Sequence, residues 1–404
     1  MVTSSNLPSP RIAEFAALQH YRQHYPALAS KSYFNFGGQG PMAQEALSAI
    51  AHAQLHSQQI GPFSHAANGW INHELVETKR AIATELGISP TTLTLTENVT
   101  VGCNIPLWGM DWQPGDHVVM SDCEHPGIIA TLLELQHRFQ IQISTCSLLD
   151  TLNEGDPVAA IQEHLRPKTR MVVISHILWN TGQVLPLTNI VNACHTYQDA
   201  EHPVLVHVDA AQSVGVLPLR LSQTNVDFYA FTGHKWLCGP AGIGGLYVSP
   251  SALESIRPTY IGWRGITKNE VGYPTGWEPD GRRFEVSTSD FALLSAMREA
   301  IALHNQWGTA TDRYQRICAL SHRLWQQLRE IPSVHCLKTS SPESGLVSFT
   351  VDNLSHAELV HQLEAKGFML RTLLHPDCIR ACVHYFTLES EVDELAALLR
   401  SLIP

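Results

Sequence analysis

Two charged side chains follow apolar, strand-like runs in this chain. Asp209 ends the run "VLVHVD", and Lys235 follows "DFYAFTGH". Taken singly, Asp209 can be a helix N-cap and Lys235 a solvated residue at the rim of a sheet. A desolvated lysine, however, has a lowered pKa and forms Schiff bases with carbonyl groups, and a buried carboxylate needs a cationic partner. Together they supply the amine and the anion that a pyridoxal 5'-phosphate (PLP) site requires for its aldehyde and its protonated ring nitrogen.

The phosphate of such a cofactor needs hydrogen-bond donors, and the sequence offers several near other strand ends. The segment "TENVTVGCN" predicts a helix that opens near Val99 and Thr100, where free backbone N–H groups can hold an anion or simply carry an N-cap. Thr232 and His234 lie beside the lysine and add further donors. His125, in "DCEHPG", can stack on an aromatic cofactor or cap the helix predicted to begin at Pro126.

The elements that must position these residues alternate between strand and helix from about residue 92. The runs are rich in Val and Ile and nearly continuous, which is typical of strands buried on both faces. Such alternation indicates an α/β fold with a mostly parallel sheet, whose ligands bind at the carboxyl ends of the strands. The predicted strands are residues 92–96, 117–122, 141–148, 170–177, 204–210, 227–232 and 242–249. The predicted helices between them are residues 126–139, 158–165 and 187–198.

The last third of the sequence predicts a smaller α+β domain. It contains predicted helices at residues 314–331, 356–367 and 393–403 and a predicted strand at 345–351, and a helix near residues 11–24 can pack beside it. The Gly- and Pro-rich residues 269–285 are expected to form a loop. We therefore predict a large cofactor-binding domain over residues 31–285 and a small domain formed by residues 1–30 and 286–404.

Composition excludes several classes of function. The chain has 404 residues, 44% of them hydrophobic, and a formal charge of −11, which disfavours nucleic acid or an anionic membrane as the main partner. We see no apolar run long enough to span a bilayer and no basic-then-apolar start typical of a secretory signal, so a cytoplasmic location is expected. The nine cysteines are scattered singly, which predicts neither a disulfide framework nor a metal site.

The segment that contains Asp209 and Lys235 resembles the signature of a known family. The segment "HVDAAQSVGVLPLRLSQTNVDFYAFTGHKWLCGPAGIGGLYV" resembles the class V aminotransferase signature, shared with cysteine desulfurases, and the similarity covers nearly the whole chain. This resemblance implies the type I fold of PLP-dependent transferases, with a large domain around a mostly parallel seven-stranded sheet.

The resemblance also implies roles for individual residues. For the cofactor these are Lys235 as covalent anchor and catalytic base, Asp209 at the ring nitrogen, Gln212 at the ring hydroxyl, His125 and Asn180 at the ring, and Val99, Thr100, Thr232 and His234 at the phosphate. Thr288, in "FEVSTS", resembles a residue that reaches the phosphate from another subunit, which implies a homodimer. For the substrate, the implied residues are Trp263, Arg380 at the α-carboxylate and Arg371 at a second carboxylate, although an arginine is more commonly part of a surface ion pair.

One departure from the family pattern separates two activities. Cysteine desulfurases present a nucleophilic cysteine on a flexible loop, commonly within "RxGxHC", whereas this chain has "LRTLLHPDC" with Pro376 after the histidine. Cys378 comes two residues later and only two before Arg380. Trp179 stands near a position where desulfurases often carry asparagine, and Asn180 can take over that contact.

These residues favour a C–S lyase that eliminates sulfur from Cβ of cystine or cysteine. Segments such as "SDCEHPGII" and "SHILWNTGQVLPL" resemble the cystine C–S lyases of the family. The implied products are pyruvate, ammonia and cysteine persulfide or sulfide, and an iron–sulfur scaffold is a candidate sulfur acceptor. The alternatives are a desulfurase that uses Cys378, an aminotransferase or epimerase of the same fold, and a PLP-binding scaffold without activity.

Overall fold

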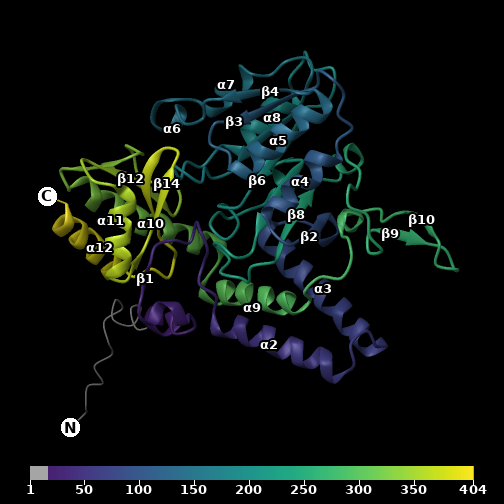
Figure 1. The fold of residues 1–404 in the computed structure, drawn as a ribbon, viewed down its shortest axis with the longest axis horizontal. Coiled ribbons are helices and arrows are strands. Elements are labelled where there is room, and N and C mark those ends of the chain that lie inside the picture. Colours follow the sequence, from purple (N-terminus) through teal and green to yellow (C-terminus); the bar gives the residue numbers. More distant parts are fainter. Residues whose placement is uncertain (1–16, 404) are drawn as a thin grey trace, which may run out of the picture.

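The large domain is built on one seven-stranded sheet (Figure 1). The computed structural model describes residues 17–403 of the chain. The strand order is β2-β8-β7-β6-β5-β3-β4; β8 runs antiparallel to both neighbours, and all other adjacent pairs are parallel. This confirms the predicted mostly parallel sheet. The strands are β2 (Leu93–Thr96), β3 (His117–Ser121), β4 (Gln142–Cys146), β5 (Thr169–Ser175), β6 (Leu205–Asp209), β7 (Phe228–Thr232) and β8 (Gly244–Val248).

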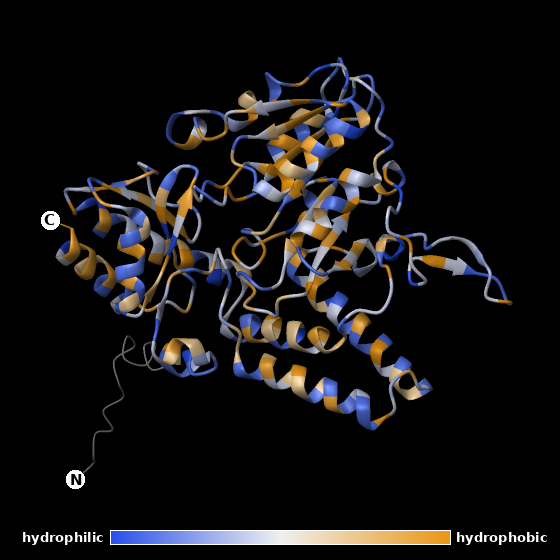
Figure 2. Ribbon diagram, in the orientation of Figure 1, coloured by the Kyte–Doolittle hydropathy of each residue, from blue (hydrophilic) through white to orange (hydrophobic). Residues whose placement is uncertain are grey.

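Both faces of this sheet are buried, as the continuous apolar runs predict. Alternate residues of each strand enter two different cores: Val172 and Val206 point into one, and Met171 and Leu205 into the other. In Figure 2 the strands of the large sheet are mainly hydrophobic, whereas the helices around them mix hydrophobic and hydrophilic residues. The large-domain helices are α2 (Gln44–Gln59), α3 (His65–Leu86), α4 (Val99–Gly109), α5 (Pro126–Phe139), α6 (Thr151–Glu154), α7 (Pro157–Gln162) and α8 (Leu187–His195).

The C-terminal part forms a second layer of sheet and helices (Figure 1, yellow-green). Its four-stranded antiparallel sheet has the order β11-β12-β15-β14 and packs its own core against the helices. The elements are α10 (Ala310–Arg329), β11 (Val334–Cys336), β12 (Leu346–Val351), α11 (His356–Ala365), β14 (Arg371–Leu374), β15 (Asp377–Cys382) and α12 (Glu389–Leu402). The helix before them, α9 (Ala292–Trp307), packs instead into a core of the large sheet. The N-terminal segment joins this part through parallel pairing of β1 (Ser32–Tyr33) with β13 (Phe368–Met369).

The predicted helix at 314–331 begins four residues earlier in the structure. Thr309 and Asp312 form a capping box, in which each side chain accepts from the backbone N–H of the other, so α10 starts at Ala310. The amphipathic pattern of the sequence marks the buried side of the helix but contains no signal for this first, exposed turn.

Residues 269–285 are not entirely loop, so that expectation is corrected. β9 (Ile266–Lys268) and β10 (Pro274–Trp277) form an antiparallel hairpin that projects from the large domain (Figure 1). The hairpin closes because Asn269 accepts hydrogen bonds from the backbone of Val271 and Tyr273 across the turn. Its aromatic and aliphatic residues are exposed and face no core. The sequence therefore lacks the alternation of apolar and polar residues that predicts a half-buried strand.

The domain boundaries stay a prediction. α9, which we place with the small domain from sequence, contributes Leu294, Met297 and Ile301 to a core of the large sheet. The predicted N-terminal helix near residues 11–24 lies partly outside the described residues, and its described part is helical over residues 17–22. Among residues 17–403, no helix is long and apolar enough to cross a membrane.

Candidate active site

Lys235 and Asp209 meet at the carboxyl edge of the large sheet. β6 ends at Asp209 and β7 ends at Thr232, and the two strands are parallel neighbours, so Lys235 emerges beside the carboxylate. Burial lowers the pKa of Lys235 to about 8; the charge of Asp209 opposes this shift, and Arg380 and Arg371 add to it. Burial also raises the pKa of Asp209, against a 2.9 Å hydrogen bond from the backbone N–H of Ala211 to its Oδ1.

His125 lies after β3 and faces the same group of charges. Its Nδ1 accepts from the backbone N–H of Gly127 at 3.2 Å, so it is the N-cap of α5, as the simpler interpretation predicts. The ring is nevertheless exposed, and it meets the indole of Trp179 edge-on with centroids 5.9 Å apart. Burial lowers the pKa of His125, as does Lys235, whereas Asp209 opposes the shift. Because the ring of this N-cap residue is exposed and its pKa is lowered, the neutral imidazole keeps a face free to stack on a planar ligand.

The anion-binding candidates lie at a helix start and next to Lys235. α4 begins at Val99, where the Asn98 side chain accepts from the N–H of Val101 at 3.0 Å. The N–H groups of the first turn that the cap does not use are donors for an anion. Thr232 Oγ1 and His234 Nδ1 form a 2.7 Å hydrogen bond beside the lysine.

Arg380 is a buried guanidinium with free hydrogen-bonding capacity. It is 1% exposed in β15 and donates from Nη1 to the carbonyl of Trp179 at 2.6 Å. Its Nε and Nη2 have no hydrogen-bond partner within residues 17–403, and burial lowers its pKa. Because a buried cation without its full set of acceptors is costly, this arrangement fits an anionic ligand. Arg371 lies opposite Arg380 on β14, with an exposed side chain.

Asn180 and Gln212 are both buried near these groups. Asn180 Nδ2 donates to the carbonyl of His375 at 3.1 Å, and its Oδ1 is without a partner in the described chain. Gln212 Nε2 donates to the carbonyl of Gly37 at 2.9 Å, and its Oε1 accepts from the indole of Trp236 at 2.8 Å. The structure therefore brings both predicted residues to the same region.

Sequence reasoning missed the N-terminal segment 34–40, "FNFGGQG". A Cβ on Gly37 would lie 2.9 Å from Cζ and Nη2 of Arg380, and a Cβ on Gly40 would lie 2.2 Å from the carbonyl oxygen of Lys235. The backbone N–H of Gly40 donates to the carbonyl of His234 at 2.7 Å. The glycines let this backbone touch both key residues, and their clustering was the only available signal in the sequence.

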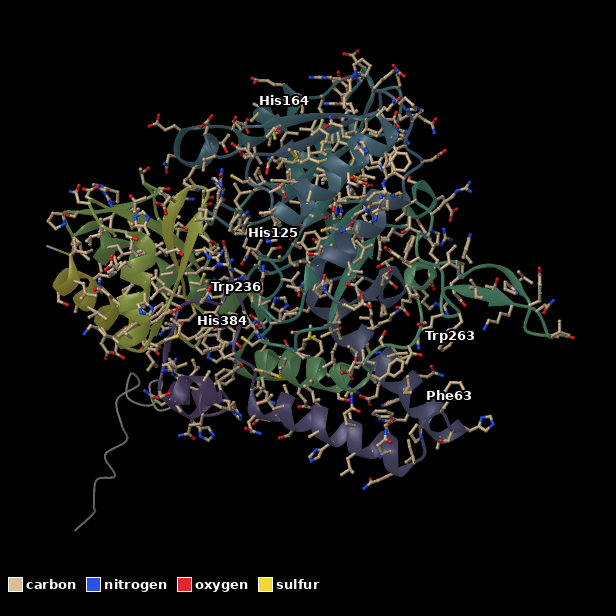
Figure 3. The ribbon with its side chains drawn as sticks, viewed as in Figure 1. Phe63, His125, His164, Trp236, Trp263 and His384 are labelled. Atoms are coloured by element: carbon tan, nitrogen blue, oxygen red, sulfur yellow. The ribbon has the colours of Figure 1, made fainter. Side chains whose placement is uncertain are left out.

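Two predicted site residues, Thr288 and Trp263, line cavities that do not include Lys235. Thr288 lines a cavity of about 480 Å³ with Thr96, Glu97 and Gly242, and Trp263 lines another with Lys79. None of Lys235, Asp209 and His125 borders either cavity. Figure 3 shows Trp263 and His125 in different parts of the molecule. Within one chain, Thr288 and Trp263 therefore line cavities that do not include Lys235.

Cys378 is fixed inside the C-terminal sheet. It is fully buried in β15, opposite Leu373 of β14, and burial raises the pKa of its thiol to about 12. None of the nine cysteines forms a disulfide in the structure; seven are buried and two are half-buried. A thiol held in a strand with a raised pKa is neither mobile nor readily ionised, unlike a loop nucleophile.

Comparison with known families identifies the fold and its relatives. The family described as "Aminotransferase class-V" matches residues 38–395. The chain belongs to this family.

The relatives of this class V chain include lyases, desulfurases and an epimerase. Two structures of the cystine C–S lyase C-DES superpose with a TM-score of 0.92 at 50% identity, and each comparison covers 94% of this chain. One, covered over 98% of its length, is a lysine-to-alanine variant with glycine covalently linked to its PLP cofactor. The other, covered completely, is a complex with the reaction product cysteine persulfide.

Curated relatives are more distant. Isopenicillin N epimerase of Streptomyces clavuligerus is 25% identical over 91% of this chain and 94% of its own length. A probable cysteine desulfurase of Chlamydia trachomatis is 31% identical over 65% of this chain and 63% of its own length. The family, the fold and the type I PLP-dependent architecture predicted from the sequence are thus confirmed.

The residues present fit pyridoxal phosphate. A lysine with a lowered pKa, a buried carboxylate within its electrostatic reach and an exposed imidazole face are the groups that such a cofactor uses. The free Nε and Nη2 of Arg380 provide the anion site that an amino-acid substrate needs beside it.

Proposed function

We propose that this chain is a PLP-dependent C–S lyase that cleaves the Cβ–S bond of cystine. The observation that carries the proposal is the buried Arg380, whose free donors lie beside Lys235, together with 50% identity to C-DES. In the overall reaction cystine and water give pyruvate, ammonia and cysteine persulfide. Cysteine is the alternative substrate and releases sulfide instead.

Each residue has a defined task in this proposal. Lys235 would anchor the cofactor, Asp209 would keep its ring nitrogen protonated, and His125 and Asn180 would help to hold the ring. Gln212 binds the ring hydroxyl. The first turn of α4, with Val99 and Thr100, holds the phosphate together with Thr232 and His234. When bound, the cofactor withdraws the electrons that remain after a proton leaves Cα.

Arg380 orients the substrate and Lys235 moves the proton. The free Nε and Nη2 of Arg380 bind the α-carboxylate as a bidentate pair, and the exposed Arg371 binds the second carboxylate of cystine. Because burial lowers its pKa, a larger fraction of Lys235 is neutral near pH 8 than of an exposed lysine. The neutral amine can therefore accept the Cα proton as general base. Loss of that proton permits the Cβ–S bond to break, and a persulfide is a better leaving group than sulfide because its conjugate acid is stronger.

The buried thiol of Cys378 argues against the desulfurase alternative. A desulfurase needs a thiolate that approaches the substrate sulfur, but Cys378 is part of a strand and burial raises its pKa to about 12. In our proposal the sulfur leaves on the small-molecule product, and its transfer to an iron–sulfur scaffold follows release. We also propose a cytoplasmic location and a homodimer in which Thr288 and Trp263 of one chain complete the site of the other.

The proposal is tested by turnover with cystine and with cysteine, measuring pyruvate and sulfane sulfur together. We expect equal amounts of pyruvate and sulfane sulfur from cystine without an added keto acid. Alanine as the product in place of pyruvate would instead establish desulfurase chemistry. The Lys235→Ala variant should lose both turnover and the visible absorbance of the covalently bound cofactor, and an active variant would refute the assignment of Lys235.

A further inference from the structure

Gln212 is held between two partners of opposite character. The Nε1–H of Trp236 can only donate, so it requires Oε1 of the amide, at 2.8 Å. The carbonyl of Gly37 can only accept, so it requires Nε2, at 2.9 Å. These two bonds select one of the two orientations of the amide. The second proton of Nε2 is then left free to donate a further hydrogen bond.

Trp236 is itself fixed from several sides. It is fully buried, and its ring stacks on His384 with centroids 5.8 Å apart and an interplanar angle of 18°. Nε2 of His384 lies 3.0 Å from the carbonyl of Trp236, to which it donates, and Phe36 stacks at 6.0 Å. A Cβ on Gly345 would lie 2.6 Å from the indole, so the glycine makes room for the ring. Figure 3 shows Trp236 and His384 together where the C-terminal domain meets the large sheet.

The amide lies where it can meet the cofactor. Gln212 follows Asp209 by three residues in the turn after β6, and its partner Gly37 packs against the guanidinium of Arg380. It is therefore close along the chain to the carboxylate assigned to the ring nitrogen, and Gly37 links it to the arginine assigned to the substrate.

We infer that Trp236 is a positioning residue that fixes the Gln212 amide so that it donates a hydrogen bond to the ring oxygen of the cofactor. The inference rests on the proposed PLP chemistry and adds a residue to it. If the amide turned over, Oε1 would face an oxygen that carries negative charge, and the two would repel each other. Trp236 does not touch the reacting atoms and acts through Gln212.

The test is the pH midpoint of the visible absorbance of the bound cofactor in Trp236→Phe. Phenylalanine keeps an aromatic ring against His384 but removes the donor, so the amide is no longer held in one orientation. With a weaker donor, the ring oxygen holds its neighbouring proton more tightly, and the midpoint rises by about half to one pH unit, the equivalent of one hydrogen bond. A second variant, Gln212→Met, removes the amide and leaves Trp236 in place. It shifts the midpoint in the same direction.

A matched control is Trp112→Phe. Trp112 is also a buried tryptophan, and its Nε1–H donates to the carbonyl of Leu107 at 2.7 Å, away from the site. This variant should keep the wild-type midpoint. The double variant Trp236→Phe/Gln212→Met should show the same midpoint as Gln212→Met alone, because both changes act through one amide.

The outcomes separate the two proposals. A wild-type chain that never develops visible absorbance with pyridoxal phosphate overturns the proposed function and this inference with it. A wild-type chain that binds the cofactor, with a midpoint unchanged in Trp236→Phe but raised in Gln212→Met, overturns the inference alone. Additive shifts in the double variant also overturn it, since Trp236 would then act independently of Gln212.

Discussion

Gly37 is expected to control catalysis through Arg380, although it has no side chain. In Gly37→Ala the new Cβ would lie 2.9 Å from Cζ and Nη2 of the guanidinium, where ordinary contact requires about 3.5 Å. The guanidinium must therefore move by roughly 0.5–1 Å, while its 2.6 Å bond to the carbonyl of Trp179 resists the movement. A displacement of this size costs about 10- to 100-fold in kcat/KM, or about 1.4–2.7 kcal/mol of transition-state binding.

Steady-state kinetics with cystine, measured as pyruvate release, test this expectation. Gly69→Ala is the matched control, because a Cβ at Gly69 in α3 meets no atom within 4 Å. The visible absorbance of the bound cofactor should stay unchanged in Gly37→Ala, since the backbone carbonyl that accepts from Gln212 is retained and the new Cβ meets Arg380 instead. If the glycine acts through Arg380, its substitution costs much less in an Arg380→Lys background. Wild-type kcat/KM in Gly37→Ala, or a loss that persists in full in that background, would refute the reasoning.

Three further expectations concern a thiol, an imidazole and the anchor lysine. Cys378→Ser should keep pyruvate and persulfide formation from cystine within about twofold of wild type, because the thiol is held in a strand, burial raises its pKa and the proposed reaction does not use it; abolished sulfur release would restore the desulfurase alternative. His207→Leu should raise the free energy of unfolding by about 1–3 kcal/mol at pH 7, because both ring nitrogens lack a partner within the described residues. Burial lowers the pKa of His207 to about 3, so the wild-type protein loses stability as the pH falls below the pKa of the unfolded chain, near 6.5. The difference in free energy of unfolding between His207→Leu and wild type should therefore be about 2 kcal/mol larger at pH 5 than at pH 7, as unfolding curves at both pH values will show. The rate at which cofactor-free enzyme binds pyridoxal phosphate covalently should rise through pH 8 and then level off, because the neutral amine of Lys235 reacts; a pH-independent rate would contradict the lowered pKa.

The sequence was informative where a residue type and its position in a strand pointed to the same chemistry. Asp209 and Lys235 each follow a continuous apolar run, and the parallel pairing of β6 with β7 brings them to one edge of the sheet. The predicted helix at residues 126–139 matches α5, because Pro126 and the capping His125 mark its start.

Contacts between distant segments were not accessible in this way. Gly37 approaches Arg380, and Trp236 stacks on His384, although each pair is far apart in the sequence, and nothing in the local sequence of either pair encodes the approach. Thr288 and Trp263 show the converse problem: a motif names them, but within one chain they line cavities away from Lys235. Spacing along the chain reports local structure, whereas these contacts depend on how the two domains pack.

The burial of the cysteines has a consequence for chemical durability. With no catalytic thiol at the surface, the proposed enzyme should tolerate alkylating agents and peroxide that silence thiol-dependent enzymes. It should also resist its own product, since a persulfide exchanges readily with accessible thiolates, whereas seven of the nine thiols are buried and burial raises the pKa of the two half-buried ones, Cys318 and Cys336. Such a catalyst can release reactive sulfur continuously while few of its own thiols are available to form sulfur adducts.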